Sequence, residues 1–186
     1  MKIAITGGIG AGKSHVCSFL KTKGIDVYDC DSAAKRLMAN SASIRQELCD
    51  LIGTDIYKGG MLQKALLAEY LLQSEANKQA VNDIVHPAVA ADFISSGLCW
   101  LESAILFDSG FYKRVSFDRV ICVTAPLDVR VARIMARDHI NRSKALEWVH
   151  RQMPQERMLE LSDIEIVNDG VHNVENQVYN IINSIQ

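Results

Sequence analysis

The chain has 186 residues, a length that fits one ordinary α/β domain with a small insertion. Apolar residues make up 48% and charged residues 23%, which excludes wholesale disorder and the collagen-like and coiled-coil classes. The 20 basic and 22 acidic residues leave a net charge of -2, which argues against a broad cationic surface for duplex nucleic acid. We therefore expect a compact soluble protein that has no nucleic-acid partner.

The sequence carries no recognisable targeting or membrane segment. The apolar run at residues 1–6 is too short for a signal-peptide core, and no other stretch approaches a membrane span. The cysteines are odd in number and include no Cys-x-x-Cys pair, so they favour neither a disulfide framework nor a zinc site. We expect a cytoplasmic protein with reduced thiols and no membrane partner. The cysteines are Cys17, Cys30, Cys49, Cys99 and Cys122.

Short runs rich in β-branched residues alternate with longer helical patterns along the chain. No repeat, low-complexity tract or Pro/Ser-rich linker divides them, so we expect one continuous unit. This alternation predicts a parallel sheet of about five strands with crossover helices. The predicted strands are residues 2–6, 25–28, 100–106, 119–124 and 164–167.

Two segments are longer than a simple crossover between strands requires. Residues 31–96 have a helical pattern throughout and are predicted to form a helical subdomain. Inside it, a helix is expected to end at His86, because the following Pro87 disfavours the α conformation of the residue before it. A second helical insertion is expected at 126–161, after the fourth strand.

The strongest motif is residues 7–14, Gly-Gly-Ile-Gly-Ala-Gly-Lys-Ser, which matches G-x-x-x-x-G-K-[ST] directly after an apolar strand. Glycines let successive backbone N–H groups surround a polyphosphate, and the start of the next helix adds a positive dipole end. Lys13 is expected to reach the β- and γ-phosphates of ATP, and the Ser14 hydroxyl to ligate Mg²⁺. The motif predicts a three-layer P-loop NTPase fold whose ATP-binding loop includes Gly8, Gly10, Ala11 and Gly12.

Two carboxylates follow the second predicted strand, at the sheet edge where open α/β proteins bind ligands. Alternation along a strand predicts that Asp29 and Asp31 point to the same side, with Cys30 buried on the other. One of the two could deprotonate a substrate hydroxyl, as phosphoryl transfer to an alcohol requires. The alternative is that Asp31 only caps the helix that begins at Ser32.

Arginines recur at i, i+3 and i+7 in the second insertion, so Arg130, Arg133 and Arg137 are expected on one helix face. Such a face could clamp phosphates. A solvated basic surface is an equally reasonable interpretation, because charged helix faces are common.

Taken together, these segments resemble the dephospho-coenzyme A kinases of coenzyme A biosynthesis. The phosphate loop and Asp-Cys-Asp are similar to that family's phosphate loop and Asp-Ala-Asp, and Ile-Val-His-Pro resembles its His-Pro motif. Ala-Ile-Leu-Phe-Asp resembles its Pro-Leu-Leu-Phe-Glu strand end, and Val-Asn-Asp-Gly resembles the family's late strand ending in Asn-x-Gly. The matches run in family order through residues 6–14, 29–31, 84–89, 104–108 and 163–170.

The resemblance implies ATP-dependent phosphorylation of the ribose 3′-hydroxyl of dephospho-CoA, giving CoA and ADP, with Mg²⁺ as cofactor. It assigns the base role to Asp31 and places His86 and Thr6 by the acceptor. Arg133 matches a lid arginine that reaches the transferring phosphates, and Arg142 is a second lid candidate for nucleotide binding.

The resemblance also implies a division of one kinase domain, 1–186, by role. Residues 1–30, 97–125 and 162–186 correspond to the nucleotide-binding core, 31–96 to the acceptor-binding subdomain and 126–161 to the lid. Asn168 and Gly170 match the family segment beside the adenine of ATP.

Three residues depart from the family pattern. His15 stands where the family has Thr after the loop serine, and we expect it to lie by ATP and add a pH-dependent charge. Ala104 replaces the proline of the strand-end motif, and Asp108 replaces its glutamate. The shorter carboxylate of Asp108 remains a candidate for holding Mg²⁺ or its waters.

Three alternatives share the phosphate loop. One is another small-molecule P-loop kinase that phosphorylates a nucleoside, nucleotide or sugar acid. A second is a GTPase-type switch, against which stands the lack of an Asn-Lys-x-Asp guanine signature. A nucleotide-binding scaffold without catalysis would require Asp31 to be idle.

Overall fold

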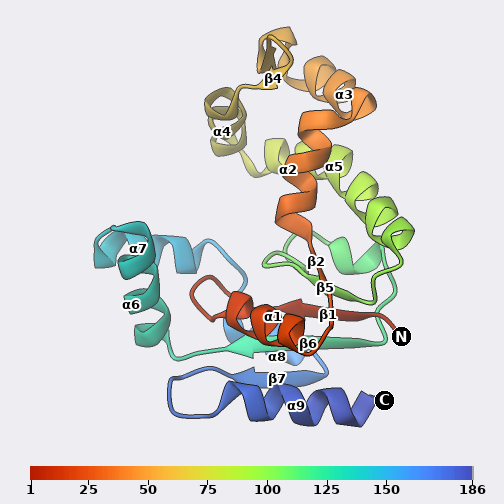
Figure 1. The fold of residues 1–186 in the computed structure, drawn as a ribbon. Helices are drawn as coiled ribbons and strands as arrows, with labels where there is room; N and C mark the ends of the chain where they lie inside the picture. Colours follow the sequence, from red (N-terminus) through yellow and green to blue (C-terminus); the bar gives the residue numbers. More distant parts are fainter. Residues whose placement is uncertain (186) are drawn as a thin grey trace. The chain divides into compact units, whose positions relative to one another are not determined.

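The computed structural model describes residues 1–185, and the chain divides into two compact units (Figure 1). The first unit comprises Met1–Tyr28 and the chain from Leu98 onward. The second unit is Asp29–Gly97. In the described part of the chain, no helix combines the length and apolar character needed to cross a membrane.

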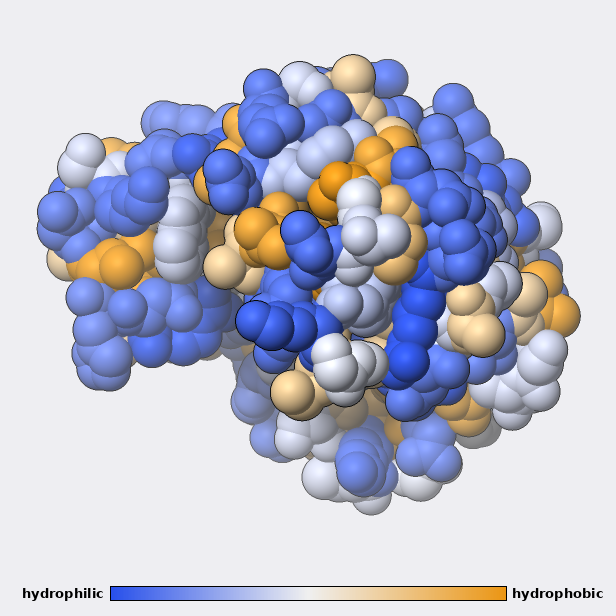
Figure 2. Space-filling view, turned by 90° about the horizontal axis from the view of Figure 1, so that it is seen from above, coloured by the Kyte–Doolittle hydropathy of each residue, from blue (hydrophilic) through white to orange (hydrophobic). Residues whose placement is uncertain are grey.

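The surface seen in Figure 2 is mainly hydrophilic, with hydrophobic residues in separate patches. The exposed apolar side chains of the second unit include Met61 and Leu72, which are 71% and 69% exposed. The five cysteines all lie in the described residues, and no disulfide joins any of them.

The first unit is built on a five-stranded sheet whose order is β2-β5-β1-β6-β7 in the described residues. β1 pairs in parallel with β5 and with β6, and β6 pairs in parallel with β7. The predicted α/β fold with a sheet of about five parallel strands is confirmed. The strands are β1 (Ile3–Thr6), β2 (Val27–Asp29), β5 (Trp100–Glu102), β6 (Arg119–Thr124) and β7 (Ile164–Val167).

Helices surround this sheet and follow its strands in the chain. After β6 come α6 and α7, which lie in Figure 1 at the same end of the sheet as the loop that follows β1. The helices of the first unit are α1 (Lys13–Thr22), the 3₁₀ turn η2 (Phe111–Lys113), α6 (Leu127–Asp138), α7 (Arg142–His150), α8 (Gln155–Glu160) and α9 (Val174–Ile185).

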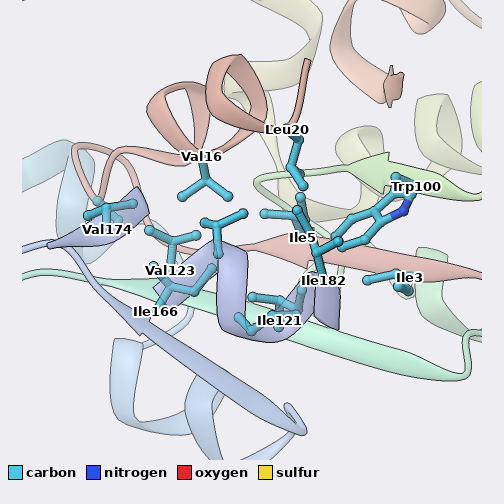
Figure 3. Packing of buried hydrophobic residues seen from close by; sticks show 13 residues of the cluster. Ile3, Ile5, Val16, Leu20, Trp100, Ile121, Val123, Ile166, Val174 and Ile182 are labelled. Atoms are coloured by element: carbon cyan, nitrogen blue, oxygen red, sulfur yellow. The ribbon is translucent and has the colours of Figure 1, made fainter. Parts of the chain in front are cut away.

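Both faces of the sheet are covered, which explains why its strands are nearly continuous apolar runs. On one face, Val16 and Leu20 of α1 meet Ile182 of α9 above the strand residues Ile5 and Val123 (Figure 3). The residues between them along the strands point to the other face and are also buried, among them Ala4, Leu101 and Cys122. Helix α8 packs against β6.

The second unit is mainly helical, and α5 contacts α2, α3 and α4 within it. The predicted helical span is interrupted by a two-stranded hairpin at Gly59-Gly60, where φ is 58° and 79°, a turn that glycine permits. Its elements are α2 (Cys30–Asn40), α3 (Ala42–Ile52), η1 (Thr54–Ile56), β3 (Tyr57–Lys58), β4 (Met61–Leu62), α4 (Lys64–Gln73) and α5 (Glu75–Ser96).

The expected helix end at His86 is wrong, because α5 continues through Pro87 to Ser96. Proline carries no N–H, so the helical hydrogen bond from position 87 is not formed. The buried residues Val81, Val85, Val89 and Phe93 form a stripe with a spacing of four residues on both sides of the proline. Packing of this stripe outweighs the local preference of the residue before proline.

The expected strand geometry around the two carboxylates is also wrong. The strand β2 ends at Asp29, and α2 begins at Cys30, so Asp31 lies in the first turn of a helix. Asp29 is the N-cap, because its carboxylate accepts hydrogen bonds from the N–H and the hydroxyl of Ser32. The third strand is shorter than predicted and ends at Glu102.

Replacing Pro87 by alanine tests the interpretation of α5. Pro87 is exposed, so Pro87→Ala removes little packing and restores a helical hydrogen bond. The alanine variant has a more flexible unfolded chain, which offsets part of the gain in the helix. We therefore expect the free energy of unfolding to rise by about 2 kcal/mol. Urea unfolding followed by helical circular dichroism measures this change, and a lower midpoint than that of the wild type would contradict the interpretation.

Candidate active site

The loop between β1 and α1 has a backbone that depends on glycine. Gly7, Gly10 and Gly12 have φ values of 145°, 79° and 97°, in or near the left-handed region that side chains avoid. Gly12 is the N-cap of α1, and its carbonyl accepts the N–H of His15. The loop therefore leads into a helix N-terminus, the geometry that binds phosphate.

Lys13 is already oriented by two partners in the loop region. Its Nζ donates a hydrogen bond of 2.9 Å to the Gly7 carbonyl and lies 3.6 Å from Oε1 of Glu102. The two charged side chains are only 11% and 18% exposed. Glu102 was not predicted, because it fell inside the predicted strand 100–106; in the structure it ends β5, opposite Ile5 in the register of β5 with β1.

Arg133 and Asn168 join the loop to the end of β7. Arg133 Nη1 donates to the carbonyls of Gly10, Ala11 and Asn168, and Nη2 donates to the Asn168 side chain at 3.1 Å. Asn168 Nδ2 donates to the Ala11 carbonyl at 2.9 Å. The structure thus brings together the predicted Arg133, Asn168 and phosphate loop, and it uses the arginine to hold loop carbonyls.

Arg130 is buried against the same loop. Its Nε donates to the Ile9 carbonyl at 3.0 Å, and a Cβ on Gly8 would lie 2.3 Å from its Nη2. Desolvation by burial lowers the pKa of Arg130. The three arginines expected on one helix face therefore differ in environment. Arg130 is buried against the loop, whereas Arg137 is exposed and pairs with Asp138 at 2.7 Å.

The connection between α7 and α8 contacts two loops of the site. Gln152 Oε1 accepts the N–H of Ile9 at 2.6 Å, and the Met153 N–H donates to the Asp108 carboxylate at 3.1 Å. Desolvation raises the pKa of Asp108, and the Met153 hydrogen bond partly opposes this. Gln152 was not predicted, because an isolated glutamine carries no sequence signal for binding a distant loop.

Several other predicted residues of the first unit lie at its surface or in turns. His15 is exposed on α1, and Arg142 is exposed and pairs with Asp128 at 2.9 Å. Gly170 is in the turn after β7. The N–H groups of His172 and Val171, followed by the His172 ring, lower the pKa of Asp169 in that turn.

The remaining predicted residues occupy defined positions within their own elements. Asp31 is exposed in the first turn of α2, and His86 is buried within α5. Desolvation by burial acts to raise the pKa of Asp29, but hydrogen bonds from Ser32 and from the Asp31 N–H, together with the Lys35 charge, lower it overall. Thr6 ends β1 with its Oγ1 buried and without a hydrogen-bond partner among the described residues.

Within the described residues, no group of three or more His, Cys, Asp or Glu side chains has the arrangement of a protein-made metal site. Oxygen donors in or beside the loop include the Ser14 hydroxyl and the carboxylate of Glu102, 3.6 Å from Lys13 Nζ. Hard oxygen donors in small number suit Mg²⁺, which is usually held by one or two protein groups together with substrate phosphates and water.

Comparison with known proteins gives one consistent family. The family model described as dephospho-CoA kinase matches residues 1–173. A dephospho-CoA kinase from Porphyromonas gingivalis is 43% identical over 194 aligned residues, which cover 99% of this chain and 94% of the relative. A dephospho-CoA kinase from Bacteroides fragilis is 40% identical over 177 aligned residues, covering 91% of this chain and 85% of the relative.

Solved structures agree in fold. A crystal structure from Thermus thermophilus superposes with a TM-score of 0.85 at 29% identity, covering 100% of this chain and 97% of that one. A dephospho-CoA kinase from Campylobacter jejuni gives a TM-score of 0.69 at 20% identity, with coverage of 100% and 98%. At that identity, the second likeness concerns the fold alone.

Alanine substitutions at two glycines that share nearly the same φ test the close packing of the loop. Gly10 (φ 79°) and Gly24 (φ 76°) impose similar strain on an alanine. A Cβ would lie 2.6 Å from the Arg130 carbonyl at Gly10, but no described atom lies within 4 Å of one at Gly24. Backbone strain should cost each variant about 1 kcal/mol of stability, and the clash with the Arg130 carbonyl should cost Gly10→Ala more.

Only Gly10→Ala should also weaken ADP binding, by at least about tenfold, because the loop or α6 must move. Calorimetric titration with ADP measures this. Gly24→Ala is the control, and equal ADP affinities for the two variants would contradict the account of the loop.

Proposed function

The chain belongs to the dephospho-CoA kinase family, and from this premise we propose that it transfers the γ-phosphoryl group of ATP to the ribose 3′-hydroxyl of dephospho-CoA. The products are CoA and ADP, and the reaction is the last step of coenzyme A biosynthesis. The observation that carries the proposal is the glycine loop, in which Lys13 is oriented at the start of α1. None of the relatives favours a guanine-nucleotide switch or a different acceptor.

The proposed ATP site is the phosphate loop. The N–H groups around Gly10 to Ser14 and the N-terminus of α1 supply donors for the polyphosphate. Lys13 exchanges part of its interaction with Glu102 for the β- and γ-phosphates, since it is held nearby but not fully buried. Asn168 and Gly170, at and after the end of β7, are proposed to border the adenine, with His15 near the phosphates.

Mg²⁺ is proposed to accompany ATP, with the Ser14 hydroxyl as a ligand and Asp108 as a further candidate. When bound, the ion would neutralise the negative charge that develops on the phosphates during transfer. The raised pKa of Asp108 is consistent with a carboxylate that gains from a nearby cation.

Asp31 is the proposed general base. Its carboxylate accepts the proton of the 3′-hydroxyl as that oxygen bonds to the γ-phosphorus, and the bond to the ADP oxygen breaks in line. The side chain is exposed in the first turn of α2, directly after a strand whose carboxyl end faces the ligand edge expected for such sheets. His86 and Thr6 are proposed to contact the acceptor.

The arginines are proposed to differ in role. Arg133 is proposed to add positive charge to the transferring phosphates while it holds the loop, since its Nη1 binds the Gly10 and Ala11 carbonyls and would lie 3.6 Å from a Cβ added to Gly12. Arg142 pairs with Asp128 at the exposed start of α7 and is proposed to reach the nucleotide when substrates bind. Residues 31–96 are proposed to bind the acceptor, 126–161 to act as the lid and the remainder to bind the nucleotide.

A phosphoryl-transfer assay with Mg-ATP and a panel of acceptors tests the function. The panel contains dephospho-CoA, adenosine, nucleoside monophosphates, gluconate and shikimate, and the product masses are recorded. We expect CoA as the dominant product. Dominant transfer to another acceptor would contradict the proposed substrate, and nucleotide binding without any transfer would contradict the enzyme activity.

Two Asp→Asn variants separate catalysis from helix capping. Asp31→Asn should lower turnover by at least about a hundredfold, the scale of a general base. Asp29→Asn is the matched control, because asparagine caps helices as well as aspartate does and should leave turnover within about threefold. Steady-state kinetics measures both, and near-normal turnover of Asp31→Asn would show that this residue is not the base.

A further inference from the structure

Ile9 is the point at which the second helical insertion holds the phosphate loop. Its N–H donates to Gln152 Oε1 at 2.6 Å, and its carbonyl accepts from Arg130 Nε at 3.0 Å. Its side chain packs against the buried cluster of Val131, Ile134, Ala145 and Val149. Both backbone groups and the side chain of one residue are therefore bound by the segment 126–161.

This attachment matters because the loop around Ile9 is rich in glycine, which gives its backbone a large conformational freedom that must be restricted. Gly7, Gly8, Gly10 and Gly12 surround it, and fixing the backbone of one residue costs about 1–2 kcal/mol of conformational entropy. Glycine loses the most freedom of all residues on being fixed. Ile9 is the β-branched residue of the loop, and holding its N–H and carbonyl restricts the dihedral angles of the glycines on either side.

The two holding side chains have contrasting chemistry. Arg130 is 5% exposed and positively charged, and the Glu156 carboxylate of the same segment interacts with its charge electrostatically. Gln152 is neutral and offers one acceptor oxygen to the Ile9 N–H. The next residue, Met153, binds Asp108 through its N–H, so the same connection also touches the loop after β5.

We propose that Gln152, together with Arg130, is a positioning residue that sets the phosphate loop for nucleotide by holding the backbone of Ile9. Gln152 itself is not placed on the substrate and acts through the loop. The proposal rests on the proposed nucleotide role of that loop. It also makes the loop conformation depend on the segment 126–161, because both side chains belong to it.

Gln152→Met removes the acceptor oxygen and keeps the length of the side chain. A cavity of about 260 Å³ borders Gln152, Val149 and Pro154, so a methionine can be accommodated without overpacking. The matched control is Gln155→Met in the same segment. Gln155 Oε1 also accepts a backbone N–H, that of Ala125 at 3.1 Å, which lies outside the phosphate loop.

The experiment measures ADP affinity by calorimetric titration, KM for ATP and for dephospho-CoA, and the thermal unfolding midpoint of each variant. Gln152→Met should weaken ADP binding and raise KM for ATP by about fivefold, the scale of one neutral hydrogen bond. KM for dephospho-CoA should change by less than about twofold. Each variant loses one neutral hydrogen bond, so the two should lower the unfolding midpoint by similar amounts. Gln155→Met should leave ADP affinity within about twofold of wild type.

Unchanged ADP affinity in folded Gln152→Met, or an equal loss in the two variants, would overturn the proposal. If Gln152→Met does not fold, Gln152→Asn replaces it, because its amide is one methylene too short to reach Ile9; wild-type ADP affinity in that variant would likewise overturn the proposal. Wild-type protein that binds no ADP would contradict the proposed nucleotide site instead, so the two failures are distinguishable.

Discussion

The glycine loop between β1 and α1 depends on hydrogen bonds from other segments for its shape. Its glycines permit the backbone angles that point N–H groups inward, but they also leave the loop free to adopt many other conformations. Arg133 and Asn168 bind backbone carbonyls of the loop. Arg130 and Gln152 bind the carbonyl and the N–H of Ile9. Side chains distant in sequence thus supply the order that the loop lacks.

The sheet topology brings these side chains together. The strands β5, β1, β6 and β7 are neighbours, and their parallel pairings place their carboxyl ends at one edge. The phosphate loop follows β1, Glu102 ends β5, Arg130 and Arg133 lie on the helix after β6, and Asn168 follows β7. A polyphosphate entering there meets a lysine already oriented by Gly7 and Glu102, so less ordering is needed on binding.

The sequence predicted the parts of this arrangement that have a local signal. The strands at 119–124 and 164–167 were found because they are short runs rich in β-branched residues, and the phosphate loop because its glycines are a backbone requirement. The helix end at Pro87 was wrong because packing along α5 overrides a preference of one residue. Gln152 and Glu102 could not be singled out, since their roles arise from contacts with residues more than 80 positions away in sequence.

Residue-resolved amide hydrogen exchange in the nucleotide-free protein tests most directly whether the loop is ordered before the nucleotide binds. The hydrogen bond to Gln152 predicts that the Ile9 N–H exchanges at least about a hundredfold more slowly than an unstructured amide. Exchange of Ile9 at the unprotected rate, while the amides of β1 remain protected, would contradict the account.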